Sequence, residues 1–103
     1  MDIVIYTLNG CSVCKALKSM LDADKIDYTE KCCDYYENEC DYVESESDCN
    51  NYPIIHIKDA NVIVCIADDV DSLKKQINTQ NKNTIVYKYD ISSMLNYIHS
   101  IKN

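Results

Sequence analysis

Short apolar runs alternate along this chain with segments that have a helical pattern. Four runs rich in β-branched residues predict strands, because such residues favour an extended backbone on a buried surface. They lie at 3–6, 54–58, 62–66 and 84–89, and a weaker run at 25–28 predicts a fifth strand. Asn50, Asn51 and Pro53 form a turn signal before the run at 54–58. We expect 54–66 to form a β-hairpin.

Three segments carry apolar residues three and four positions apart, which is the spacing of one buried helix face. The first helix is expected at 12–24, where Val13, Leu17, Met20 and Leu21 give this spacing. The second is expected to be capped by Asp68 or Asp69 and to carry Val70, Leu73 and Ile77, before a polar linker at 78–83. The third is expected to be capped by Asp90 and to carry Ile91, Met94, Leu95, Ile98 and Ile101.

The segment 34–48 has seven acidic residues and no basic one. We expect a fourth helix here, with a half-buried face formed by Tyr35, Tyr36, Cys40 and Val43, to which Tyr42 is a further candidate. Its acidic face is expected to be solvated, and the alternative is a docking surface for a basic partner.

The order of elements predicts one α/β domain over 1–103, with a central mixed sheet flanked by helices. Residues 84–103 have two possible roles. In the first, they add an extra strand and helix at the edge of the sheet. In the second, residues 67–83 are an insertion, and residues 84–101 supply the terminal elements of the fold. The sequence leaves this alternative open.

Composition excludes several classes of protein. The chain has 103 residues, a net charge of -7 and no arginine, which argues against binding to nucleic acid. It has no run of about 18 apolar residues, so no membrane span is expected. Its first residues lack the pattern of a secretory signal, and we therefore expect a cytoplasmic protein.

Seven cysteines are many for this length, and only Cys11 and Cys14 have C-x-x-C spacing. No second such pair accompanies them, so no metal site is expected. Cys32, Cys33 and Cys65 are expected to be buried, inert thiols, whereas Cys40 and Cys49 are expected to be exposed. Cys49 precedes Pro53 by four residues and is a possible regulatory thiol near the active site.

The C-x-x-C pair lies between a predicted strand and a predicted helix. Unpaired backbone N–H groups at a helix start stabilise a thiolate, and Lys15 and Lys18 would add to this if they lie close. We expect Cys11 to be the exposed nucleophile and Cys14 the resolving thiol of a thiol–disulfide exchange. A proline that opens an apolar strand and faces such a pair is expected to be cis, which would leave the Tyr52 backbone free to pair with an extended substrate.

The chain resembles the glutaredoxin branch of the thioredoxin superfamily. The resemblance covers about residues 2–69 and depends on the segments 3–7, 11–18 and 52–55. It implies a thioredoxin-like fold and a thiol–disulfide oxidoreductase that reduces protein disulfides. It also implies substrate contacts at Ser12, Val13, Tyr52, Pro53 and Asp68.

The positions with which this family binds glutathione differ here. Leu8 stands where a basic residue is usual, Val13 where an aromatic residue is usual, and 63–64 where a Gly-Gly pair is usual. We expect no tightly bound cofactor, electrons from glutathione or from thioredoxin reductase, and a monomer or weak dimer.

Three alternative functions remain from the resemblance. One is a redoxin that supplies electrons to ribonucleotide reductase and is recycled by thioredoxin reductase. Another is a protein that binds a [2Fe–2S] cluster between two subunits, which Ser12 after the first cysteine suggests. The third is a redoxin-fold adaptor without enzymatic activity.

Overall fold

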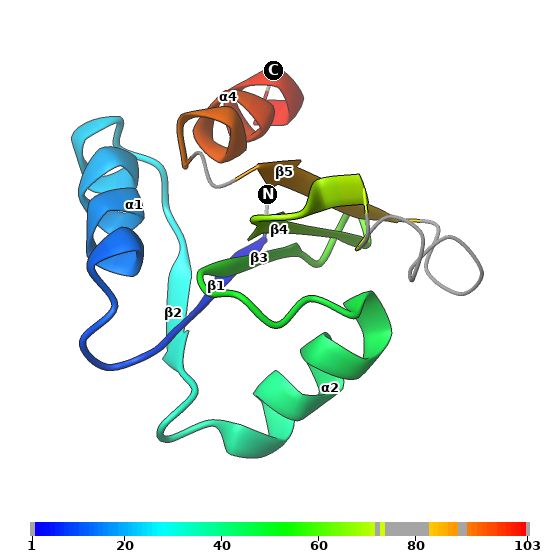
Figure 1. Cartoon of the computed structure of the whole chain (residues 1–103). Helices are drawn as coiled ribbons and strands as arrows, with labels where there is room; N and C mark the ends of the chain where they lie inside the picture. Colours follow the sequence, from blue (N-terminus) through cyan, green and yellow to red (C-terminus); the bar gives the residue numbers. More distant parts are fainter. Residues whose placement is uncertain (1, 72, 74–82, 89–90, 103) are drawn as a thin grey trace.

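A five-stranded mixed sheet forms the centre of the computed structural model, which describes residues 2–71, 73, 83–88 and 91–102 (Figure 1). The elements in chain order are β1 (Ile3–Thr7), α1 (Ser12–Ala23), β2 (Thr29–Cys32), α2 (Glu37–Ser47), β3 (Ile54–Ile57), β4 (Val62–Ala67), β5 (Thr84–Lys88) and α4 (Ile91–Lys102). The α/β fold class expected from the sequence is confirmed.

The strands lie in the order β2-β1-β3-β4-β5. β1 pairs with β2 in parallel and with β3 in the antiparallel direction. β3 and β4 form the expected antiparallel hairpin, and β5 pairs with β4 in parallel. β1 therefore lies between two strands, and all five of its residues are buried. Burial on both faces explains why its sequence is a continuous apolar run rather than an alternating one.

Two hydrophobic layers cover the two faces of the sheet. Ile3 and Ile5 pack in one layer with Leu17 of α1 and with Met94 and Ile98 of α4. The alternate residues of β1 contribute to a second layer, which includes Cys40 and Val43 of α2. Figure 1 shows α1 and α4 on one side of the sheet and α2 on the other. The sheet thus has a helical layer on each face.

The second strand is displaced from its predicted position. The sequence predicts a strand at 25–28, but β2 covers Thr29–Cys32. Lys25 has a left-handed backbone with φ 56°, and the amide of Ile26 donates to the carbonyl of Leu21, 3.0 Å away. These residues therefore end α1 instead of starting a strand. Ile26 is buried, and its apolar character reflects packing beneath α1.

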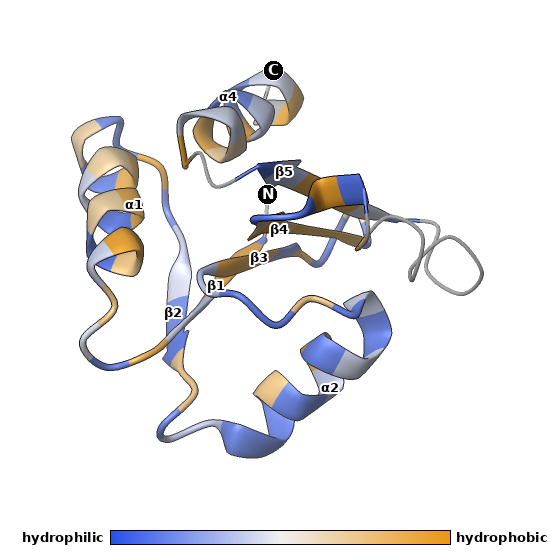
Figure 2. Ribbon diagram, viewed as in Figure 1, coloured by the Kyte–Doolittle hydropathy of each residue, from blue (hydrophilic) through white to orange (hydrophobic). Residues whose placement is uncertain are grey.

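The acidic helix is present, but its buried face is smaller than predicted. Cys40, Val43 and Ser47 are its buried residues. Tyr35, Tyr36 and Tyr42 are 78%, 45% and 55% exposed, so their predicted burial is wrong. Figure 2 shows that most of α2 is hydrophilic. Two disulfides, Cys33–Cys40 and Cys49–Cys65, hold this helix to the rest of the chain.

The C-terminal part combines both arrangements that the sequence left open. β5 adds a strand at the edge of the sheet, beside β4. α4 packs with α1 and the central strands in the first hydrophobic layer. Residues 70, 71 and 73 are helical, as predicted, whereas Ile77, Tyr89 and Asp90 lie outside the described residues. Among the described helices, none has the length and apolar character needed to cross a membrane.

Candidate active site

The C-x-x-C pair lies where β1 gives way to α1. A short exposed turn at 8–10 follows β1, and Gly10 takes the left-handed backbone (φ 77°) that favours glycine. Cys11 is the N-cap residue of α1, and Cys14 lies in its first turn. Cys11 is half-buried, whereas Cys14 is only 1% exposed. A partner can therefore approach the first cysteine and not the second.

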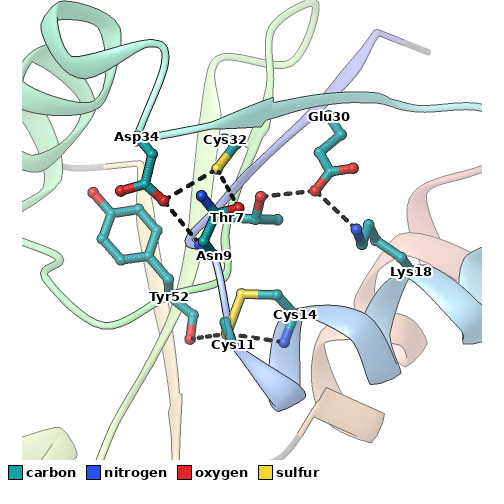
Figure 3. The surroundings of a disulfide bond; sticks show 9 residues. All are labelled: Thr7, Asn9, Cys11, Cys14, Lys18, Glu30, Cys32, Asp34 and Tyr52. Carbon is teal, nitrogen blue, oxygen red and sulfur yellow. Dashed lines mark hydrogen bonds and ion pairs between the residues drawn. A yellow bond between two sulfur atoms is a disulfide. The ribbon is translucent and has the colours of Figure 1, made fainter.

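Cys11 and Cys14 form a disulfide (Figure 3). The backbone N–H of Cys14 donates to Cys11 Sγ over 3.1 Å. No acidic residue lies in the first turn of α1, so no carboxylate opposes the positive end of the helix there. In the reduced protein the same N–H and the same helix end would stabilise a thiolate on Cys11.

The segment Tyr52–Pro53 faces this disulfide. The Tyr52–Pro53 peptide bond is cis, which confirms the expectation from the sequence. The carbonyl oxygen of Tyr52 lies 3.9 Å from Cys11 Sγ. Figure 3 shows the Tyr52 backbone beside the sulfur atoms and its ring directed away from them. A backbone group of the residue before the proline thus lies next to the exposed cysteine.

The phenol of Tyr52 is anchored on α2. Its hydroxyl donates to Glu44 Oε2, and the whole residue is only 8% exposed. Burial and the hydrogen bond to Glu44 raise the pKa of Tyr52 well above its usual range. The hydroxyl therefore stays protonated and remains a donor at physiological pH.

Of the two lysines of α1, Lys18 is paired with a carboxylate, and the expected effect of Lys15 stays a prediction. Lys18 Nζ is 2.8 Å from Glu30 Oε2, and the Thr7 hydroxyl donates to the same oxygen over 2.8 Å. The hydrogen bond from Lys18 is the main cause that lowers the pKa of Glu30. Lys15 is exposed. The predicted help of Lys18 to the thiolate is wrong, because its ammonium group is bonded to a carboxylate on β2.

The other predicted contact residues lie around the same end of the sheet. Ser12 is exposed and Val13 half-buried, both in the first turn of α1. Asp68 is exposed and directly follows β4. The antiparallel register of β3 and β4, in which Ile55 pairs with Val64, brings the end of β4 to the side of Tyr52. Their role in substrate binding stays a prediction.

The remaining cysteines differ most from the predictions. Cys40 and Cys49 were expected to be exposed, but they are 3% and 0% exposed. Cys33 pairs with Cys40, and Cys49 pairs with Cys65, so none of these four is a free thiol. Cys49 is consequently not available as a regulatory thiol in this structure. Hydrophobic periodicity could not show these pairings, since each one joins residues of different segments, at sequence separations of 7 and 16.

Cys32 is the one free cysteine of the described residues. Its Sγ atom lies 3.6 Å from Asn9 Oδ1 and 3.5 Å from Asp34 Oδ2. The backbone N–H of Asn9 also donates to Asp34 Oδ2 over 3.0 Å. Asp34 thereby ties the turn before Cys11 to the end of β2, a contact that the sequence gave no signal for. No group of three or more His, Cys, Asp or Glu side chains among the described residues could hold a metal ion.

Fold and site together define a thioredoxin-like protein with a dithiol–disulfide centre. The defining features are a cysteine pair at a helix start, a cis-proline opposite it, and the mixed sheet that positions both. A scan against protein-family models matches glutaredoxin over residues 3–62, and the chain belongs to the glutaredoxin family. Searches of curated proteins and of solved structures found no match for this chain.

Proposed function

We propose that this protein reduces disulfide bonds in other proteins, with Cys11 as the nucleophile and Cys14 as the resolving thiol. The observation that carries the proposal is the Cys11–Cys14 disulfide at the start of α1, with the Tyr52 carbonyl 3.9 Å from Cys11 Sγ. The difference in exposure supports this order of reaction, since Cys14 is only 1% exposed.

The reaction is a two-electron exchange in two steps. The Cys11 thiolate attacks one sulfur of the substrate disulfide, forms a mixed disulfide and expels the other substrate sulfur as a thiolate. Cys14, after losing its proton, attacks Cys11 Sγ and expels the second substrate thiolate. The substrate gains two electrons, and the protons lost by Cys11 and Cys14 end on its two thiols. The protein is left with the Cys11–Cys14 disulfide.

The backbone of Tyr52 supports a peptide substrate. An extended segment beside the disulfide bond can pair with the backbone groups of the residue before the proline. The electrons that restore the dithiol would come from glutathione or from thioredoxin reductase. Leu8 stands where the family usually has a basic residue that binds glutathione. It is 41% exposed and lies next to Cys11, whose backbone N–H donates to its carbonyl. Its side chain offers no positive charge to a carboxylate of glutathione. This favours thioredoxin reductase.

The test follows the reduction of a protein disulfide with two electron supplies in parallel, glutathione with its reductase and NADPH with thioredoxin reductase. Cys11→Ser should lower turnover to the background rate without protein, because the attacking thiolate is removed. Cys14→Ser should still make the first attack through Cys11 and then accumulate a mixed disulfide with the substrate, detected as an added mass. Cys32→Ser is the matched control and should keep the parent's rate.

Each outcome decides a separate part of the proposal. Turnover by Cys11→Ser equal to that of the parent would exclude Cys11 as the nucleophile. Turnover with thioredoxin reductase alone would reject glutathione as the reductant, and the opposite result would reject thioredoxin reductase.

A further inference from the structure

One side chain of the acidic helix reaches the candidate active site. The carboxylate of Glu44 on α2 accepts a hydrogen bond from the Tyr52 hydroxyl. Glu44 is half-buried, whereas Glu37, Glu39 and Glu46 of the same helix are exposed. Burial of the hydrogen-bonded pair makes the bond more than a fluctuating surface contact, because charged hydrogen bonds strengthen as water is excluded.

The two ends of Tyr52 contact different parts of the molecule. At one end its hydroxyl is bonded to α2, and at the other its carbonyl lies 3.9 Å from Cys11 Sγ. The chain between Glu44 and Tyr52 is itself fixed by the buried Cys49–Cys65 disulfide, which joins it to β4. The orientation of the Tyr52 backbone is therefore set by α2 as well as by the strand that follows it.

We propose that Glu44 is a positioning residue, which acts through the Tyr52 hydroxyl to hold the Tyr52 backbone in place for pairing with a peptide substrate. This inference rests on the proposed function. It assigns the acidic helix a role in the recognition of peptide disulfides. Glu44 touches neither the reacting sulfur atoms nor the substrate, so its effect should be confined to substrates that use the backbone of Tyr52.

The experiment compares two substrates in a single turnover of the pre-reduced protein. Insulin supplies a disulfide within a peptide, and hydroxyethyl disulfide supplies one without a peptide backbone. Formation of the Cys11–Cys14 disulfide is followed by alkylation and mass spectrometry. Tyr52→Phe and Glu44→Met, which removes the acceptor at similar side-chain length, should each lower the second-order rate constant with insulin about tenfold, mainly through weaker binding. Glu44→Met should react with hydroxyethyl disulfide within about twofold of the parent.

A second tyrosine–glutamate pair on α2 provides the matched control. The Tyr42 hydroxyl is hydrogen-bonded to Glu46, and both residues are exposed. Tyr42→Phe and Glu46→Met make the same chemical changes on the same helix without touching Tyr52. They should react with both substrates at the rate of the parent.

The double variant Tyr52→Phe/Glu44→Met tests whether the two residues act as one unit. Its rate with insulin should equal that of the weaker single variant, because removing either partner already breaks the bond. Additive losses, or equal losses with both substrates together with a lower melting temperature, would overturn the positioning role. A parent that reacts with neither substrate would instead overturn the proposed function itself.

Discussion

The half-buried side chain of His56 makes the stability of the fold depend on its charge. It lies in β3 between Val4 of β1 and Ile63 of β4, and its Nδ1 atom is buried without a hydrogen-bond partner among the described residues. Burial lowers the pKa of His56, and the nearby ammonium group of Lys58 lowers it further, against a smaller opposing effect of Asp2. The folded protein therefore favours the neutral ring.

This shift predicts a loss of stability in mild acid. The unfolded chain binds a proton at His56 near its ordinary pKa of 6.5, and the folded chain binds it at a lower pH. The free energy of unfolding should therefore fall as the pH drops from 6.5 through the folded pKa, and this contribution is constant below it. Urea unfolding over this range should show the slope for the parent and for His99→Gln. His56→Leu should lack it, and an unchanged slope in that variant would disprove the assignment.

At the scale of elements, α2 depends on covalent bonds more than on its hydrophobic face. Cys40, Val43 and Ser47 are its buried residues, and most of its other side chains are acidic or polar. Cys33–Cys40 encloses its first turn, and Cys49–Cys65 fixes the chain that leaves it. Such a helix would be marginal without tertiary support. The disulfides therefore stabilise α2, whereas apolar packing stabilises α1 and α4.

Removal of either disulfide should lower the stability of the protein. The loops closed by these bonds span 7 and 16 residues of sequence separation. Cys33→Ser/Cys40→Ser and Cys49→Ser/Cys65→Ser should each lower the free energy of unfolding by about 2–3 kcal/mol, the second by slightly more. Chemical denaturation measures the change, with Cys32→Ser as the control. A loss below about 0.5 kcal/mol would show that the bonds do not support the helix.

The two disulfides should also differ in their reaction with a reductant. Cys49 and Cys65 are both fully buried, whereas Cys33 is half-buried. A water-soluble phosphine should therefore reduce Cys33–Cys40 before Cys49–Cys65, as followed by stepwise alkylation and peptide mass mapping. Reduction in the opposite order would contradict the burial found here.

Elements that pack against the core were the predictable part of this fold. Helix 12–24 was predicted within one residue of α1, because Leu17 and Leu21 give a clear helical pattern. β2 was misplaced, because an edge strand of sequence TEKC needs no apolar run. In the site, the cysteine pair and the cis-proline follow from local spacing. The Glu44–Tyr52 bond and the two other disulfides join residues 7 to 16 positions apart across a turn of the chain, and neither helical nor strand periodicity encodes such contacts.

At the scale of the whole molecule, the net charge of -7 acts on every encounter with a partner. Asp34 and Asp68 are exposed beside the elements that carry the site, so the charge near the site is negative as well. A field of one sign steers oppositely charged partners and repels like-charged ones. The two additional disulfides bear on the predicted cytoplasmic location, since such bonds are more common in oxidising compartments. That location stays a prediction.

The net negative charge predicts that salt slows the reaction with a positively charged substrate and speeds the reaction with a negatively charged one. A lysine-rich peptide disulfide should react faster than a matched glutamate-rich one in low salt, and its advantage should fall about tenfold as ionic strength rises to physiological values. Stopped-flow rates of the reduced protein at several salt concentrations measure this. Equal rates for the two peptides in low salt would show that the overall field does not guide association.

The outer strands of the sheet decide how the molecule behaves toward its own copies. β2 and β5 are the edges, with four and five residues. Glu30 and Lys31 stand on one edge, and Lys88 ends the other. Short edges with charged side chains resist the addition of a further strand, because a second copy would have to bury those charges. The fold thus protects its apolar central strands, β1, β3 and β4, from edge-to-edge aggregation by placing them inside.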